Sequence, residues 1–184
     1  MDLNKIKDDF KSVCHKYDYV TVEGSGGIIC PIRWDNSEHI LLEDIIKTLE
    51  LNTIIIADSG LGTINATVLT TEYLKSKNIG IKGIILNHYT GNHMQKNNMD
   101  MIQELTGVPV IECVAPNDKN INISKKSGDV PVNESSRIPA NRHIIIGTSI
   151  DNASCVTSDR AFIIFLSIIY LLATKFTKRF IYCL

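Results

Sequence analysis

The chain has 184 residues, enough for one domain with a sizeable hydrophobic core. Hydrophobic residues make up 44% and charged residues 21%, with a formal net charge of −1, so no basic excess points to nucleic acid. The five cysteines are scattered without a Cys-x-x-Cys pair, which predicts reduced thiols in a cytoplasmic protein, not a disulfide framework or a zinc site. No basic and apolar leader opens the chain, so we expect no signal peptide.

The first predicted strand ends in an acidic residue. Apolar residues at helical spacing predict a helix over residues 2–16, and the run Tyr19–Glu23 then predicts a buried strand. A glycine-rich loop, Gly24–Gly27, follows directly. Parallel sheets bind ligands at the carboxyl ends of their strands, and glycines let backbone N–H groups approach an anion. Glu23 is therefore a candidate ligand for Mg²⁺ that bridges to phosphate; the alternative is that it caps the loop.

A second strand-to-helix corner follows a short extended piece and a short helix. The extended piece, Ile28–Ile32, contains a proline that argues against a central strand, and Leu41–Leu49 has helical spacing. The β-branched run Thr53–Ala57 predicts a strand buried on both faces, and residues 58–62 lead into a helix over Thr63–Lys77. The first amides of that helix predict an anion site at Thr63, Ile64 and Asn65. The alternative is that Thr63 merely caps the helix.

The alternation of strand and helix continues to about residue 114. Ile81–Leu86 predicts a third strand closed by Asn87, whose amide could pair with a purine edge or simply form a turn. A helix with Met94, Met101, Ile102 and Leu105 on one face follows, and we interpret its methionines as core packing. Val110–Val114 predicts a fourth strand. This order predicts an α/β fold with a parallel sheet and flanking helices.

The composition changes after Pro116. Residues 119–143 are rich in Asn, Lys, Ser and Pro and predict a linker, whereas Ile144–Ile146 could form another strand. The apolar run over residues 161–173 is short for a bilayer span and favours a buried helix over a membrane anchor. We therefore divide the chain into an α/β domain, a linker and a hydrophobic tail, at residues 1–118, 119–143 and 144–184.

Four motifs together resemble one family. They are Val-Glu-Gly-Ser-Gly-Gly at 22–27, Ala-Asp-Ser-Gly-Leu-Gly-Thr-Ile-Asn at 57–65, Gly-Ile-Ile-Leu-Asn at 83–87 and Leu-Thr-Gly-Val-Pro-Val at 105–110. In order and spacing they resemble dethiobiotin synthetase over about residues 2–118. The resemblance implies a P-loop NTPase-like fold and a cytoplasmic, homodimeric ligase of biotin biosynthesis. Such an enzyme uses ATP and Mg²⁺ to carboxylate 7,8-diaminononanoate with CO₂ and close the ring of dethiobiotin.

The resemblance also implies roles for residues of this chain. Glu23 would hold Mg²⁺, and the loop Gly24, Ser25, Gly26 and Gly27 would lie against the carbamate and the γ-phosphate. Thr63, Ile64 and Asn65 would bind the substrate carboxylate across the homodimer interface. Asn87, Pro116 and Asn117 would lie near the adenine ring.

One part of the family pattern is missing from the sequence. The family begins with a strand and a G-x-x-x-x-G-K-[ST] loop that binds phosphate, and this chain contains no such loop. The resemblance therefore implies an N-terminally truncated domain whose sheet lacks its central strand and its phosphate-binding lysine. Two alternatives stay open: another P-loop ligase of the superfamily, and a non-catalytic remnant that serves as an interaction module.

Overall fold

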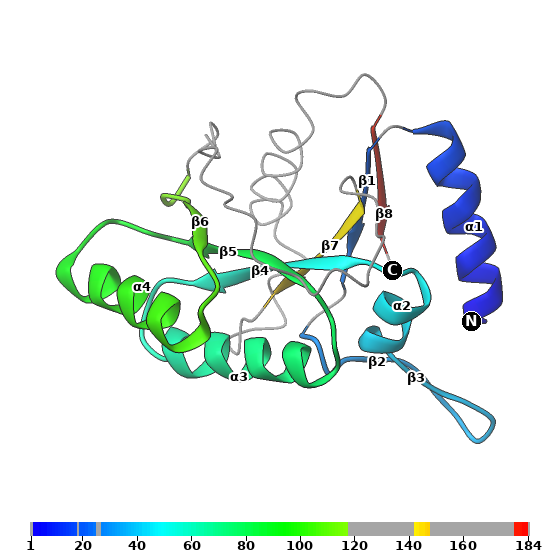
Figure 1. The fold of residues 1–184 in the computed structure, drawn as a ribbon, viewed down its shortest axis with the longest axis horizontal. Coiled ribbons are helices and arrows are strands. Elements are labelled where there is room, and N and C mark those ends of the chain that lie inside the picture. Colours follow the sequence, from blue (N-terminus) through cyan, green and yellow to red (C-terminus); the bar gives the residue numbers. More distant parts are fainter. Residues whose placement is uncertain (1, 18, 25–26, 118–141, 148–178, 184) are drawn as a thin grey trace.

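The computed structural model describes residues 2–17, 19–24, 27–117, 142–147 and 179–183. These residues form a six-stranded sheet in the order β6-β5-β4-β7-β1-β8, together with a separate two-stranded hairpin (Figure 1). Every neighbouring pair in the large sheet is parallel. The predicted α/β class with a parallel sheet and flanking helices is confirmed.

The N-terminal elements lie close to their predicted positions. Helix α1 (Leu3–Lys16) begins at Asp2, whose carboxylate accepts a hydrogen bond of 2.8 Å from the Asn4 N–H. Strand β1 (Tyr19–Glu23) has the predicted bounds. Three successive side chains of β1 are almost completely buried, which places both of its faces in the interior: Val20, Thr21 and Val22.

The predicted extended piece with its proline forms a hairpin outside the main sheet. Strands β2 (Pro31–Trp34) and β3 (His39–Leu41) pair antiparallel, and the Trp34 and His39 rings stack with centroids 4.1 Å apart. The hairpin projects away from the sheet (Figure 1), so the expectation that Pro31 excludes a central strand is confirmed. Helix α2 (Leu42–Thr48) follows directly.

The middle of the chain alternates strand and helix as predicted. The elements are β4 (Asn52–Asp58), α3 (Thr63–Ser76), β5 (Ile81–Asn87), α4 (His93–Thr106) and β6 (Val110–Cys113). Helices α3 and α4 pack side by side along β4 and β5 (Figure 1). The core beneath them consists mainly of branched aliphatic side chains with almost no exposed surface, among them Ile55, Leu74, Ile84, Leu86 and Ile102.

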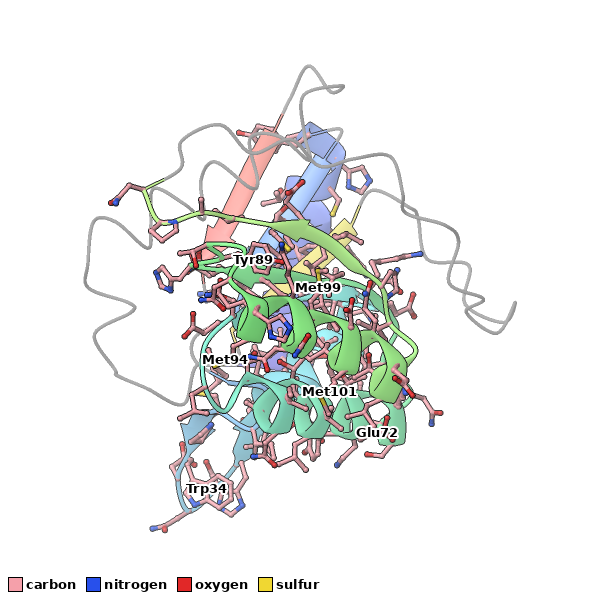
Figure 2. All side chains as sticks on the ribbon, turned by 90° about the vertical axis from the view of Figure 1, so that its left-hand side faces the viewer. Trp34, Glu72, Tyr89, Met94, Met99 and Met101 are labelled. Carbon is pink, nitrogen blue, oxygen red and sulfur yellow. The ribbon has the colours of Figure 1, made fainter. Side chains whose placement is uncertain are left out.

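The interpretation of the α4 methionines as core packing is wrong. Met94 and Met101 are 45% and 48% exposed, and Leu105 is 55% exposed, whereas Ile102 is fully buried. The helix faces the core with Ile102 and Thr106 and turns the stripe at 94, 101 and 105 outward (Figure 2). Helical spacing alone does not tell which of two apolar stripes faces the sheet.

The C-terminal part contributes two described strands. Strand β7 (Arg142–Gly147) includes the expected strand at 144–146, and β8 (Arg179–Cys183) lies at the edge beside β1. Strand β7 lies between β4 and β1, where the family resemblance implies a missing strand. Most of the predicted linker and the whole apolar run at 161–173 lie outside the described residues. Within the described part of the chain, no helix is long and apolar enough to cross a membrane.

Packing between β5 and β6 gives a first prediction. A Cβ at Gly83 would lie only 2.6 Å from Cγ2 of Ile111, a buried and branched side chain. Gly83→Ala should therefore lower the free energy of unfolding by about 1–3 kcal/mol in urea titrations, because the two strands must move apart. In an Ile111→Ala background the same change should cost almost nothing. An equal loss in both backgrounds would contradict the close approach.

Candidate functional site

Three neighbouring strands end together at one edge of the sheet. Asp58 at the end of β4 is the register partner of Asn87 at the end of β5. Beyond the strands, the Val114 N–H donates to the Leu86 carbonyl and the Tyr89 N–H donates to the Val114 carbonyl, both at 2.8 Å. These two hydrogen bonds hold the loop after β6 against the end of β5. The predicted adenine-contacting residues, Asn87, Pro116 and Asn117, thus follow adjacent strand ends.

The N-terminus of α3 has no side-chain cap. Gly62 is the N-cap residue in a left-handed conformation (φ +86°), and no described side chain caps this helix end. The Thr63 hydroxyl donates to the Asp58 carbonyl instead. The alternative that Thr63 caps the helix is therefore wrong. Thr63 is buried and its N–H donates to the Gly60 carbonyl at 3.4 Å, so the amides that remain at the uncapped end are those of Ile64 and Asn65. Asn65 is exposed and Ile64 is half-buried, so the predicted anion site has access to solvent.

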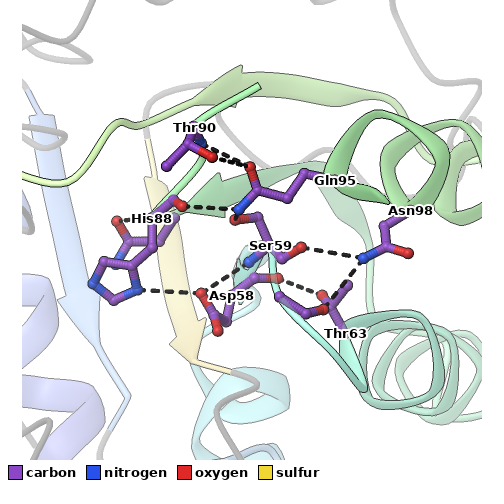
Figure 3. Close-up of polar contacts among 9 residues, drawn as sticks. Asp58, Ser59, Thr63, His88, Thr90, Gln95 and Asn98 are labelled. Carbon is purple, nitrogen blue, oxygen red and sulfur yellow. Dashed lines mark hydrogen bonds and ion pairs between the residues drawn. The ribbon is translucent and has the colours of Figure 1, made fainter. Parts of the chain in front are cut away.

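Gln95 connects the corner to the loop after β5, which the sequence analysis did not predict. Its Nε2 donates to Ser59 Oγ at 2.8 Å and to the His88 carbonyl at 3.1 Å (Figure 3). Its Oε1 accepts from the N–H groups of Thr90 and Gly91 at 2.7 and 3.1 Å. Both Gln95 and Ser59 are buried, so these bonds replace water and fix the two loops against each other.

Asn98, one turn further along α4, holds the same corner. Its Nδ2 donates to the carbonyls of Ser59 and Gly60, both at 3.2 Å (Figure 3). One sequence signal could have identified this role of α4. Asn92 is its N-cap, with Gln95 three residues later, a spacing typical of a helix start that fixes the preceding loop. The two amide side chains make α4 the support of the candidate site.

Asp58, Asn87 and His88 make a polar cluster at the strand ends. Asp58 Oδ1 accepts the Ser59 N–H at 2.9 Å and lies 3.1 Å from His88 Nδ1 (Figure 3). Asn87 Oδ1 accepts the His88 N–H at 2.9 Å. His88 has a left-handed backbone (φ +54°), which turns the chain sharply after β5. Asn87 therefore takes part in the turn, and its amide nitrogen and second oxygen lone pair remain as possible contacts for a purine edge.

Glu23 lies apart from this cluster. Ile145 of β7 is the register partner of both Glu23 and Ile54, so Glu23 is level with a residue four positions before Asp58. With β7 between them, β1 and β4 lie about 10 Å apart, and Asp58 lies about 13 Å further along the strand direction. The ligand-binding edge is therefore stepped, and Glu23 does not contact Asp58.

The glycine loop after Glu23 is only partly described. Gly24 is half-buried and Gly27 is exposed, and a Cβ at Gly27 would meet nothing within 4 Å. Ser25 and Gly26 lie outside the described residues. The described residues hold no group of three potential metal ligands. Magnesium often binds through one or two carboxylates together with phosphate oxygens and waters. The Glu23 carboxylate by itself could therefore be the protein ligand in such a site.

The Cys113 thiol, at the end of β6, is not suited to nucleophilic chemistry. Burial, with a contribution from Glu112, raises the pKa of the Cys113 thiol to about 11. Its sulfur lies 3.8 Å from Met99 Sδ. Because a thiolate is the reactive form, Cys113 is a packing residue. Burial also raises the pKa of the Tyr89 hydroxyl beside it. Neither Cys113 nor Tyr89 is therefore activated as a nucleophile.

The Gln95 contacts give a second prediction. Gln95→Ala leaves buried Ser59 without its partner and should cost about 1–3 kcal/mol in urea unfolding. Hydrogen exchange should become faster over residues 58–63 and 88–91. The matched control is Asn97→Ala on the exposed side of the same helix, where the amide contacts only the His93 ring and the expected change is within about 0.5 kcal/mol. Equal effects of the two substitutions would contradict a role of Gln95 in holding the corner.

Comparison with known proteins agrees with the resemblance found in the sequence. A family model described as an AAA domain matches residues 1–124. An ATP-dependent dethiobiotin synthetase of Brachyspira hyodysenteriae is 54% identical over 114 residues, which cover 61% of this chain and 52% of that protein. Proteins of the same name from Clostridium botulinum strains Loch Maree and 657 are 51% and 47% identical, over 61% and 67% of this chain and 50% and 54% of their own lengths. The chain spans about half the length of the curated relatives it matches, and the resemblance to dethiobiotin synthetase is confirmed. Because the family model covers most of the sequence, the chain belongs to this AAA-domain family of P-loop NTPase-like α/β proteins.

Proposed function

We propose that the chain serves the ATP- and Mg²⁺-dependent carboxylation and ring closure of 7,8-diaminononanoate with CO₂ to dethiobiotin. The observation that carries the proposal is the uncapped N-terminus of α3 beside the polar ends of β4 and β5. An uncapped helix end suits a carboxylate, and Asn87 one strand away suits a purine edge. A ligand edge with room for a carboxylate and a nucleotide fits a reaction that joins CO₂ to an amino acid at the expense of ATP.

Each predicted residue has a place in this proposal. Glu23 would hold Mg²⁺, which neutralises phosphate charge when it is bound. The loop Gly24–Gly27 would offer backbone N–H groups to the carbamate and the γ-phosphate. Residues Thr63, Ile64 and Asn65 would orient the substrate carboxylate, and Asn87 with the Pro116–Asn117 turn would hold the adenine ring.

The phosphate-binding lysine has to come from elsewhere in this proposal. The sequence contains no G-x-x-x-x-G-K-[ST] loop, and transfer of a phosphoryl group depends on such a lysine for charge neutralisation. Turnover would therefore require that a second polypeptide, or a longer protein of which this chain is a part, supplies this loop. Cys30 and Cys113 form no disulfide, which supports a reducing compartment such as the cytoplasm.

We also propose a homodimer, built on the outward face of α3 and α4. Five of the large exposed apolar side chains lie on this face or at the start of α3: Leu61, Leu69, Met94, Met101 and Leu105. We call this set the α3–α4 surface; Figure 2 shows Met94 and Met101 on it. An apolar patch of this kind is typical of a subunit interface. Asn65 lies one helical turn before Leu69 in α3, so the substrate-carboxylate site would border the second subunit.

The metal assignment gives a third prediction. Calorimetry should show that Mg²⁺ raises the affinity of the full chain for ATP, and Glu23→Gln should reduce that gain at least tenfold because a neutral amide is a poorer ligand. Glu50→Gln is the matched control, since Glu50 is exposed and precedes β4 at the opposite end of the sheet. An unchanged magnesium effect in Glu23→Gln would rule out this assignment.

The same preparation separates the alternative functions. Mixed with a polypeptide that carries the G-x-x-x-x-G-K-[ST] loop of a relative, the chain should release ADP only when diaminononanoate and bicarbonate are both present. ATP binding without turnover on diaminononanoate would favour another P-loop ligase. Failure of the native chain to bind Mg·ATP, with the fold intact by circular dichroism, would favour the non-catalytic interaction module.

The α3–α4 surface gives a fourth prediction. Leu69→Glu places a charge in the centre of the proposed interface and should convert the dimer to a monomer in light scattering coupled to gel filtration. Trp34→Glu is the control, because Trp34 is equally exposed, at 65%, but lies on the β2–β3 hairpin. A native chain that elutes as a monomer would contradict the homodimer.

A further inference from the structure

Strand β1 has two strand neighbours, and both come from the C-terminal part of the chain. It pairs with β7 through residues 20–23 and with β8 through residues 19–23. Residues 142–147 and 179–183 lie beyond the segment that the family model matches. Among the described residues before 118, no strand is a neighbour of β1 in the sheet.

The burial of β1 requires such neighbours. Its Val20, Thr21 and Val22 are between 0% and 1% exposed, so neither face meets solvent. A strand buried on both faces cannot exchange its edge hydrogen bonds for water, and its N–H and C=O groups need partner strands. Strand β4 has the same need, since it pairs with β5 on one edge and with β7 on the other.

Without β7 the sheet would separate into two parts. One part would be β4 with β5 and β6, which carries the Asp58 corner and Asn87. The other would be β1, which carries Glu23. We propose that residues 142–147 are the strand that joins these parts within one chain, and that the carboxyl end of β7 at Gly147 belongs to the ligand-binding edge. The C-terminal segment is then part of the scaffold of the site, not an appended tail.

The register places the end of β7 between the two halves of the site. Ile145 is level with Glu23, and Gly147 is level with Ile56, two residues before Asp58. In the sheet, β7 lies between β1 and β4, which follow each other in the large sheet along the chain. Likewise, β1 lies between β7 and β8, which also follow each other along the chain. Such a reversal of strand order leaves a crevice at the carboxyl ends where anionic ligands bind. Glycine at this end exposes backbone to a ligand in that crevice.

Hydrogen exchange of the full chain tests this inference independently of the proposed function. In the native chain the amides of residues 19–23 should exchange slowly. Ile145→Pro breaks the ladder of a central strand, and it should speed exchange over 19–23 at least a hundredfold while residues 81–87 and 110–113 change less than threefold. Ile145→Val, which suits a strand equally well, should leave all four strands protected. Unchanged protection of 19–23 in Ile145→Pro would overturn the inference.

Cross-linking provides a second measurement if the proline variant does not fold. Thr21 and His143 are register partners in neighbouring parallel strands, whose Cα atoms lie within the range that a disulfide spans. The double variant Thr21→Cys/His143→Cys should form this disulfide within one chain under mild oxidation. The out-of-register pair Thr21→Cys/Ile145→Cys should form it at least tenfold more slowly. Equal rates for the two pairs would overturn the inference.

A mixing experiment decides whether the strand comes from the same chain. Isotope-labelled chains with Thr21→Cys alone are refolded together with unlabelled chains that carry His143→Cys alone. Peptide mapping should find no disulfide between position 21 and position 143 in the mixture. An efficient disulfide between labelled and unlabelled chains would show that a second copy supplies the strand, which would overturn the assignment to one chain.

Discussion

The candidate site depends on one requirement, which is that a buried strand must find hydrogen-bond partners along both edges. Strand β1 ends at Glu23 and is buried on both faces, with Val20 and Val22 on one face and Thr21 on the other. Its partners β7 and β8 come from more than a hundred residues further along the chain. The position of Glu23 relative to the rest of the edge is therefore set by long-range pairing. Local conformation cannot supply that position, because a strand by itself does not define its neighbours.

The second half of the edge is held in a different way. The corner after β4 is short and rich in glycine, and by itself it has several possible conformations. Amide side chains of α4 remove this freedom, since Gln95 bonds to Ser59 and Asn98 bonds to the carbonyls of Ser59 and Gly60. The Thr63 hydroxyl is engaged with the Asp58 carbonyl. The Thr63 N–H donates to the Gly60 carbonyl. Because these polar groups of the corner have partners, the corner is ordered while the Ile64 and Asn65 amides at the start of α3 stay open to an anion.

Much of this fold could be predicted from the sequence, because the strands and helices of residues 2–114 have strong local patterns. The bounds of β1 were predicted, and Asn87 was correctly placed at the end of β5. The place of β7 could not be predicted, since the run Ile144–Ile146 indicates a strand but not its partners. The outward direction of Met94 and Met101 was missed because α4 has two apolar stripes and only packing decides between them. Thr63 was a plausible cap by residue type, but Gly62 takes the N-cap position in a conformation that favours glycine.

The stepped edge suits two ligands better than one. Glu23 and Asp58 are separated by two strand spacings across the sheet and about 13 Å along it, too far for both carboxylates to bind one metal ion. In the proposed function, this separation would place a metal-bound phosphate chain near Glu23 and a substrate carboxylate at the N-terminus of α3. Strand β7 ends at Gly147, at a register position between these two places. In the function that we propose, the two substrates would lie in separate halves of this edge, and a continuous sheet would hold the two halves at a fixed distance so that the reacting groups meet over the end of β7.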